Sequence, residues 1–337
     1  MQQSLILGFG RAGRQLHLHC LRKAMANHPT LFNQNIGVVD PNIHSCNFKE
    51  KNIKFFSNLR EVEGFNPLST VVHVCTPPEL HGEALEQAAK LGFTKFIIEK
   101  PLSTTIQELE KIHEINKKYN LDILVVANWL SSSLTFELVD IIQSRKYGPL
   151  LHIVAEQNKA RLSRTINNKS HGNSFDIEIP HLMALSLFLG GSNVEVVAAN
   201  TSDMYIENHV FPHMGTASID LLHSNGITSK LSSNLESPIR ERCIRLYFRD
   251  YRIIGYYPCS QEDSYAWINI YSSDNQLLDK KVMYDDPLPR NFSDYYKYFN
   301  DSRDKPISDL DFNSRIVTAL YKAKETCGLI LSEEYIT

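Results

Sequence analysis

The chain has 337 residues, of which 42% are apolar, so it is long enough for one large or two ordinary domains and is not an extended disordered protein. Its formal net charge is −3, and no block of like charge stands out, which argues against nucleic acid as a partner. No apolar segment approaches the roughly 18 residues that span a bilayer, so we expect no membrane partner.

The cysteines and the first residues indicate the compartment. The six cysteines are scattered and form no C-x-x-C pair, as is typical of reduced thiols in a reducing environment. The first apolar run is too short for a signal peptide and lacks a basic region before it. We therefore expect a cytoplasmic location. The cysteines are Cys20, Cys46, Cys75, Cys243, Cys259 and Cys327.

The first recognisable motif is a G-x-G-x-x-G turn that follows an apolar run at residues 4–7. Gly8 permits the turn, Gly10 has no side chain to block a pyrophosphate, and Gly13 lets helix and strand pack closely. Backbone N–H groups at the start of the following helix would bind the phosphates. An ordinary strand–helix joint is the alternative. The predicted cofactor-binding residues of this turn are Gly8, Phe9, Gly10, Arg11, Ala12 and Gly13.

A second apolar run, residues 35–39, ends in Asp40. An acid at this point of a dinucleotide-binding unit accepts hydrogen bonds from the ribose hydroxyls and repels a 2′-phosphate, which favours NAD over NADP. Asp40 lies 27 positions after Gly13, whereas about 20 is usual. A turn-forming acid before Pro41 is the alternative.

The first part of the chain alternates between strand and helix patterns, which predicts a doubly wound parallel sheet with right-handed crossovers. Ligands of such sheets bind beyond the carboxyl ends of the strands. The glycine turn, Asp40, Thr76, Lys100 and Asn128 all follow predicted strands. These strands span residues 35–39, 53–56, 69–75, 95–98 and 121–127, with helices at 79–91 and 105–119.

The pattern changes near residue 150, where strands separated by turns predominate. Asn225-Gly226 predicts a hairpin. We expect an α/β protein: a Rossmann domain at 1–128, then an α+β domain at 129–337 with a large, mostly antiparallel open sheet. Its last helix, 309–327, could return to pack on the first domain, and the open sheet favours a homodimer or homotetramer. The expected strands are 151–156, 194–200, 216–222, 244–248 and 266–271, with a helix at 180–189.

Two further motifs make the chain resemble the glucose–fructose oxidoreductase/inositol dehydrogenase (Gfo/Idh/MocA) family. They are Cys75-Thr76-Pro77-Pro78-Glu79-Leu80-His81 and Glu99-Lys100-Pro101-Leu102, and the glycine turn, Asn128 and the domain layout agree with them. The resemblance covers nearly the whole chain. It implies NAD(P)-dependent redox chemistry on sugars, cyclitols or their derivatives, without a metal. It also implies cofactor contacts from Cys75, Thr76, Pro77, His81, Glu99, Lys100 and Asn128.

Lys100 is the first predicted catalytic residue. Hydride transfer from a secondary alcohol requires a group that handles the hydroxyl proton. An ammonium at this strand end can orient the substrate oxygen, with Glu99 as its partner charge. A solvated ion pair at a strand–loop junction is the alternative reading.

The second family signature is an Asp and a His at the start of a helix in the C-terminal domain. The best match is Asp176 with His181, spaced by five positions where the family usually has four, so that Pro180 occupies the expected His position. We expect His181 to take the proton and Asp176 to orient it, with Glu178 as a reserve acid. The alternatives are that Asp176 is a simple turn residue and that His181 is a histidine whose polar groups are satisfied at the start of a helix. The three side chains could hold a metal, but their spacing is not diagnostic of one.

Substrate contacts are expected from Lys100, Asn128 and His181, and from a polar stretch at residues 160–173. Arg161 and Arg164 in that stretch could bind an anionic substituent, although a solvated loop is equally compatible; Arg240 and Arg242 are further candidates. The predicted function is hydride transfer between nicotinamide C4 of NAD and a ring hydroxyl of a sugar, sugar phosphate or cyclitol. An imine or double-bond reductase and a non-catalytic dinucleotide-sensing regulator are the alternatives.

Overall fold

The computed structural model describes every residue except 44–49, 51, 168–170, 261, 301–303 and 331–337. The chain divides into two compact units. The first unit comprises Met1–Asn128 and Leu288–Val317, and the second comprises Trp129–Pro287 and Thr318–Thr337. In the described ranges, no helix combines the length and apolarity that crossing a membrane would require.

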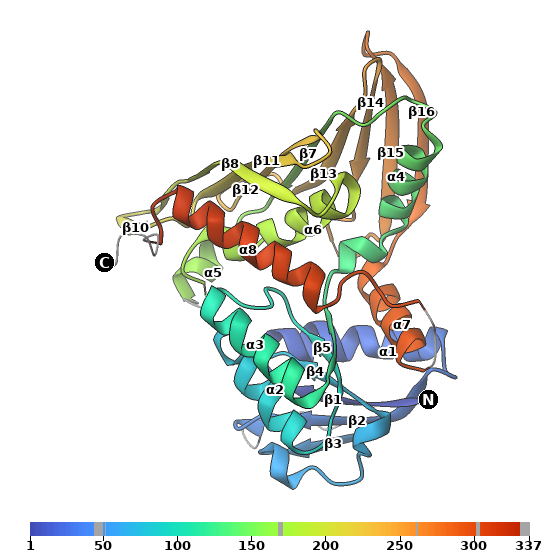
Figure 1. The fold of residues 1–337 in the computed structure, drawn as a ribbon, viewed down its shortest axis with the longest axis vertical. Coiled ribbons are helices and arrows are strands. Elements are labelled where there is room, and N and C mark those ends of the chain that lie inside the picture. The colour runs from blue at the N-terminus through green and yellow to red at the C-terminus, as the bar shows by residue number, and fades with distance from the viewer. Residues whose placement is uncertain (44–49, 51, 168–170, 261, 301–303, 331–337) are drawn as a thin grey trace. The chain divides into compact units, whose positions relative to one another are not determined.

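The first unit is built on a six-stranded parallel sheet in the order β3-β2-β1-β4-β5-β6 (Figure 1). The predicted doubly wound sheet is therefore confirmed. The direction of winding reverses between the adjacent strands β1 and β4, and ligands of such sheets bind at this point. The strands are β1 (Gln2–Leu7), β2 (Phe32–Val39), β3 (Ile53–Phe56), β4 (Thr70–Val74), β5 (Lys95–Ile98) and β6 (Asp122–Val125).

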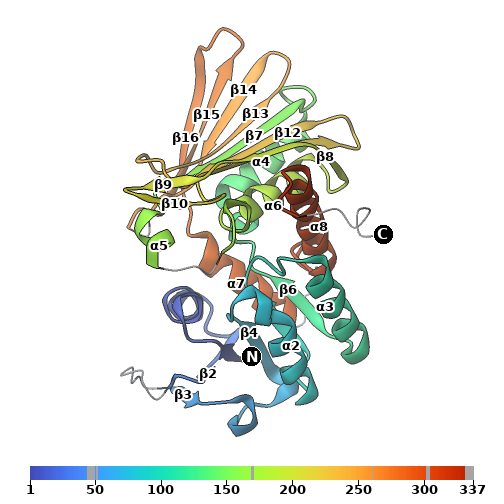
Figure 2. The ribbon, with the colours of Figure 1, turned by 90° about the vertical axis from the view of Figure 1, so that its left-hand side faces the viewer.

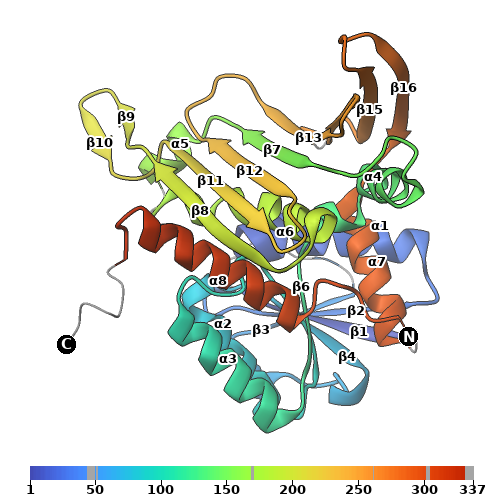
Figure 3. The same cartoon turned by 45° about the horizontal axis from the view of Figure 1, so that its top comes forward.

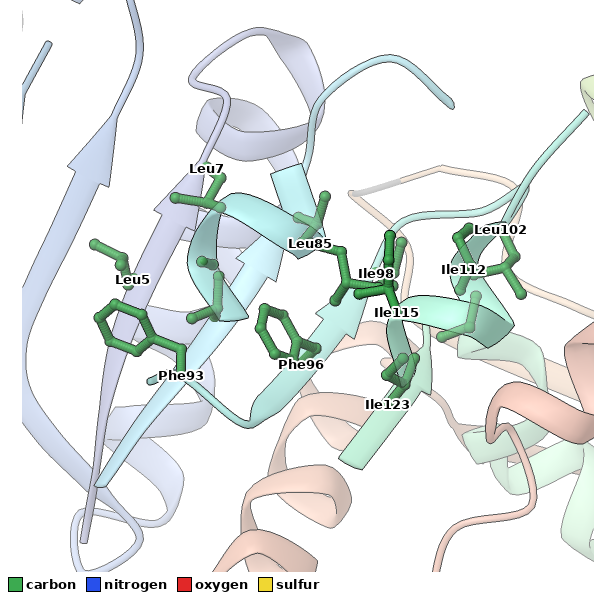
Figure 4. Close-up of a cluster of buried hydrophobic side chains, with 14 of the residues drawn as sticks. Leu5, Leu7, Leu85, Phe93, Phe96, Ile98, Leu102, Ile112, Ile115 and Ile123 are labelled. Atoms are coloured by element: carbon green, nitrogen blue, oxygen red, sulfur yellow. The ribbon is translucent and has the colours of Figure 1, made fainter. Parts of the chain in front are cut away.

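Helices cover both faces of this sheet, so its strands are apolar on both sides. Leu5 and Leu7 belong to the cluster that includes side chains of α2 and α3 (Figure 4), whereas Ile6 belongs to the cluster of α1 and α7. The sequence patterns did not predict α7, whose Phe292 is fully buried. The helices are a π-helical segment (Ala12–Leu18) continuing into α1 (His19–Asn27), α2 (His81–Lys90), α3 (Ile106–Tyr119), α7 (Pro287–Phe299) and the first half of α8 (Leu310–Thr326).

The second unit is built on an eight-stranded sheet in the order β16-β15-β14-β13-β7-β12-β11-β8 (Figure 2). All neighbours are antiparallel except β7 and β12, so the predicted mostly antiparallel sheet is confirmed. The strands are β7 (His152–Asn158), β8 (Val194–Thr201), β11 (Thr216–His223), β12 (Thr228–Asn234), β13 (Glu241–Tyr247), β14 (Tyr251–Tyr256), β15 (Tyr265–Ser272) and β16 (Leu277–Tyr284).

One face of this sheet carries helices. α6 (Ile179–Gly190) packs on β7 and β12, and α4 (Ser133–Ser144), which the sequence patterns missed, packs on β15 and β16. Asn225-Gly226 forms the predicted hairpin turn between β11 and β12, with Gly226 at φ +87°. A small hairpin of β9 (Met204–Ile206) and β10 (His209–Phe211) extends from the ends of β8 and β11 (Figure 3).

Candidate active site

The glycine turn after β1 has the geometry that the motif predicts. Gly8 has φ +90°, and a Cβ there would lie 2.9 Å from the carbonyl oxygen of Cys75. A Cβ on Gly13 would lie 2.0 Å from the carbonyl oxygen of Gly8, so only glycine allows the helix to approach the strand this closely. A Cβ on Gly10 would meet no described atom within 4 Å. The turn therefore leaves open space at the position where a pyrophosphate would lie.

Asp40 follows β2 and is tied to this turn. Its Oδ2 accepts a hydrogen bond from the backbone N–H of Phe9 at 2.7 Å, and its Oδ1 accepts one from the backbone N–H of Asn42 at 2.8 Å. Two carboxylate oxygens offer about four acceptor positions, so further hydrogen bonds from ribose hydroxyls remain possible. These contacts hold the carboxylate beside the glycine turn.

Two of the buried polar atoms that have no hydrogen-bond partner among the described residues lie just after strands of the first unit. They are Oγ1 of Thr76, just after β4, and Oδ1 of Asn128, just after β6. Buried polar atoms left unpaired destabilise the folded state by about 1–3 kcal/mol each. Polar groups of a bound ligand would satisfy them, so these atoms, the open space at Gly10 and the carboxylate of Asp40 fit a dinucleotide.

His81 connects the two motifs on which the family resemblance was based. Its ring is fully buried, with Nδ1 3.0 Å from the carbonyl oxygen of Leu102 and Nε2 3.0 Å from that of Thr76. Burial lowers the pKa of His81, and the two carbonyl oxygens oppose that shift. In the structure the ring of His81 joins the Thr76 and Leu102 segments, and its cofactor contact stays a prediction.

Glu99 and Lys100 follow β5, which neighbours β4 in the sheet. The backbone N–H of Lys100 donates to Oε2 of Glu99 at 3.0 Å, and both side chains are half-buried. Cys75 lies buried at the end of β4, where burial and the charge of Glu99 raise the pKa of its thiol well above its usual value. The Cys75 thiol is therefore protonated and contributes no nucleophile.

Behind Glu99 lies a buried hydrogen-bond network that the sequence did not reveal. Nε2 of His17 is 2.8 Å from Oε1 of Glu99, and Nδ1 of His17 is 2.9 Å from Nδ1 of His73. Nε2 of His73 is 2.9 Å from the hydroxyl of Tyr296, which is 2.6 Å from Oγ of Ser4. A histidine inside the apolar run of β4 was the available signal, because a buried ring needs polar partners.

This network controls the charge of Glu99. Burial raises the pKa of Glu99, but the hydrogen bond and charge of His17, followed by the charge and backbone N–H of Lys100, outweigh it and lower that pKa to about 2. His17 lies in the π-helical segment, a geometry that is frequent at functional sites. Burial and the charge of His17 together lower the pKa of His73 well below its usual value. Glu99 is therefore a carboxylate at neutral pH.

In the second unit, His181 lies in the first turn of α6 as predicted, and Pro180 occupies an adjacent early position. The imidazole ring of His181 stacks on the indole of Trp129, with ring centroids 5.6 Å apart and an angle of 10° between the planes. Trp129 stacks in turn on Tyr257 at 4.6 Å, and the hydroxyl of Tyr257 is 2.8 Å from Oγ1 of Thr135. The ring plane of His181 is thus set by an aromatic stack.

Asp176 lies in a short 3-10 segment (Ser174–Asp176), where its Oδ1 accepts a hydrogen bond from Nζ of Lys324 at 2.7 Å. Both side chains are buried. Sequence reasoning missed Lys324, because a lysine near the end of a helix usually points to solvent. The prediction that Asp176 orients His181 stays a prediction.

Glu178, the predicted reserve acid, immediately precedes α6. Its Oε2 accepts a hydrogen bond from Nε2 of Gln157, and its Oε1 is 3.5 Å from Nζ of Lys159. Arg161 lies two residues after Lys159, and its backbone N–H donates a hydrogen bond to the carbonyl oxygen of Leu235. These contacts join the carboxyl end of β7 to the start of α6.

The first unit thus has the fold and turn geometry of a dinucleotide-binding oxidoreductase. Residues 3–127 match the model of the Gfo/Idh/MocA family, described as an oxidoreductase family with an NAD-binding Rossmann fold. The predicted resemblance to that family is confirmed over these residues. The match supports an NAD(P)-dependent oxidoreductase.

Solved structures similar in fold cover nearly the whole chain. A 3-ketoreductase from Actinomadura kijaniata, in complex with NADP and TDP-benzene, has a TM-score of 0.77 at 12% identity, covering 97% of this chain and 98% of its own. A protein from Desulfitobacterium hafniense described as an NADPH-dependent oxidoreductase has a TM-score of 0.78 at 14% identity, covering 97% and 95%. A protein from Klebsiella pneumoniae described as an oxidoreductase has a TM-score of 0.76 at 13% identity, covering 99% of this chain and 96% of its own. No curated protein sequence is significantly similar.

Proposed function

We propose that the protein transfers a hydride between NAD and a ring carbon of a sugar, sugar phosphate or cyclitol, interconverting a hydroxyl and a ketone. The observation that carries this proposal is the placement of Lys100 after β5. Thr76 follows β4, the neighbour of β5 in the sheet, and the glycine turn follows β1, the strand on the other side of β4. This supports the proposal, because ligands of such sheets bind beyond the carboxyl ends of the strands, where Lys100 follows β5.

NAD(P), when bound, supplies the nicotinamide ring that accepts or donates the hydride. The Lys100 ammonium orients the substrate oxygen and stabilises negative charge on it as its proton leaves. The imidazole of His181 takes that proton during oxidation and returns it during reduction. The carboxylate of Glu99, ionised through its contact with His17, is the partner charge for Lys100.

Asp40 supports NAD as the coenzyme, because its carboxylate would repel the 2′-phosphate of NADP. The ketoreductase of similar fold binds NADP and a TDP derivative. It supports ketone reduction on a sugar-like substrate for this chain as well. The homodimer or homotetramer and the cytoplasmic location expected from the sequence stay predictions.

The test compares wild type, Lys100→Met and His181→Asn for coenzyme binding by fluorescence titration and for turnover of polyols and ketosugars. We expect each variant to retain NAD binding but to lose about 10²- to 10⁴-fold in kcat. Lys117→Met, at an exposed lysine of α3, should leave both unchanged.

Equal turnover by wild type and Lys100→Met would remove Lys100 from the mechanism. Turnover of imines or conjugated double bonds alone would favour a reductase of that class. Tight NAD binding without turnover of any substrate would favour a sensing role.

A further inference from the structure

Positive charge gathers in the second unit at one end of the eight-stranded sheet. Lys159 follows β7, Arg242 lies on β13 directly opposite Gln157, and Arg240 immediately precedes β13. Arg164 lies on α5 (Leu162–Asn167), which follows Lys159 along the chain. Three of these four side chains are half-buried, and Arg240 is exposed.

The pleat of β13 turns the acidic side chain of Glu241 away from Arg242. Alternate residues of a strand face opposite sides of a sheet. Arg242 therefore shares a side with Gln157 and α6, whereas Glu241 faces the other side. There Glu241 pairs with Arg245 at 3.7 Å.

The electrostatics at Lys159 reflect this excess of cations. Burial lowers the pKa of Lys159, Glu178 opposes that shift, and the charges of Arg242, Arg164 and Arg240 lower it further. The charges of three arginines thus act on Lys159 together with the carboxylate of Glu178. Excess positive charge at a partly buried site is unfavourable for folding unless an anion balances it.

Arg242 supplies a second, geometric observation. One terminal nitrogen, Nη1, donates to the carbonyl of Pro258 at 2.7 Å, and Nε is buried without a hydrogen-bond partner in the described part of the chain. The guanidinium carbon lies 5.9 Å from the ring centre of Trp129, the ring on which His181 stacks. The cation cluster and the candidate base are therefore connected through one indole.

We propose that Lys159, Arg164, Arg240 and Arg242 form a subsite for a phosphoryl group of the substrate. Guanidinium groups bind phosphate through paired N–H donors, and a cluster of cations suits a dianion. The inference rests on the proposed function and narrows its substrate to a phosphorylated or nucleotide-linked sugar. Arg242 lies over the ring of Trp129, on which His181 stacks. A phosphoryl group bound by Arg242 would therefore lie close to His181 and to the sugar ring on which His181 would act.

The experiment measures ligand binding by calorimetry with the protein saturated in NAD, so that the glycine turn is already filled. Glucose 1-phosphate and TDP-glucose are titrated as the two sources of phosphoryl groups, with glucose as the uncharged control. We expect wild type to bind a phosphorylated ligand and not glucose. Arg240→Gln and Arg242→Gln should each weaken binding about 10- to 100-fold.

Arg249→Gln is the matched control, since this exposed arginine lies in the hairpin at the other end of β13. Arg240→Gln changes an exposed side chain, so we expect this variant to fold and its ligand affinity to report on the subsite. Equal affinity of wild type and Arg240→Gln, or absence of phosphate-dependent binding, would overturn the subsite. Failure to bind NAD at all would instead overturn the proposed function.

Discussion

Nδ1 of His17 and Nδ1 of His73 lie 2.9 Å apart in the core of the first unit, so one ring must donate a hydrogen bond to the other. When His17 is protonated it donates from both nitrogens, to Glu99 and to His73. His73 then donates from Nε2 to the hydroxyl of Tyr296. The pair thus links an ionised carboxylate at the candidate site to a fully buried tyrosine.

This pair predicts a pH dependence of stability. The pKa of His73 is lower in the folded chain than its usual 6.5, so the unfolded chain binds more protons below that pH. Stability should be complete above pH 6.5 and should fall as the pH drops below it, by at most about 1.4 kcal/mol per pH unit for each such group. His81 and His223, whose pKa values burial also lowers, add to the slope.

Urea unfolding followed by circular dichroism between pH 5 and 8 measures this slope. His73→Gln should reduce it, because glutamine keeps polar contacts but does not titrate. His19→Gln, at an exposed position two residues after His17, should leave the slope unchanged. An identical slope in wild type and His73→Gln would contradict the shift at His73.

The glycine turn predicts two different outcomes for two similar substitutions. Gly13→Ala would place Cβ 2.0 Å from the carbonyl oxygen of Gly8 and should destabilise the protein by about 1–3 kcal/mol or more. Gly10→Ala meets open space, so its stability should stay within about 0.5 kcal/mol of wild type.

Coenzyme titration further distinguishes the Gly10→Ala variant from the Gly13→Ala variant. Gly10→Ala should weaken NAD binding about tenfold, a loss of about 1.4 kcal/mol, because the methyl group would occupy pyrophosphate space. Unchanged affinity in a folded Gly10→Ala protein would mean that the dinucleotide does not approach this residue.

Asp40 predicts the coenzyme preference. Asp40→Ser should weaken NAD binding about tenfold or more through loss of charged hydrogen bonds, and should improve NADP binding through loss of repulsion. Dissociation constants for both coenzymes measure the change. Asp250→Ser, in the exposed hairpin after β13, is the control. A preference for NADP in wild type would show that Asp40 has only its structural role beside Phe9.

The buried pair of Asp176 and Lys324 predicts a large coupling. Lys324→Met leaves a buried carboxylate without its partner and should cost about 3–5 kcal/mol of unfolding free energy. Lys322→Met, at an exposed lysine of the same helix, should cost less than about 1 kcal/mol.

A double-mutant cycle with Asp176→Asn isolates the interaction. The double variant should be more stable than the sum of the two single losses predicts, because neither charge is then left alone. Strictly additive losses would show that the two side chains do not stabilise each other.

Much of the fold and of the coenzyme site could be predicted from the sequence by itself. Apolar runs such as residues 4–7 and 69–75, alternating with helical patterns, determined a parallel sheet, because hydrophobic periodicity is a local property of the chain. The glycine spacing determined the turn after β1, since Gly8 and Gly13 meet steric limits that no other residue satisfies. Local rules also placed Lys100 and Asp40 at strand ends.

Only the tertiary structure decided how the polar core residues pair. Asp176 and Lys324 are 148 positions apart, and His73 and Tyr296 are 223 apart, so no local spacing reveals either contact. Helix α7, whose Tyr296 completes the network, enters the first unit from beyond residue 287. A buried polar group must find a partner wherever the chain supplies one, and that choice depends on the folded packing rather than on neighbouring residues.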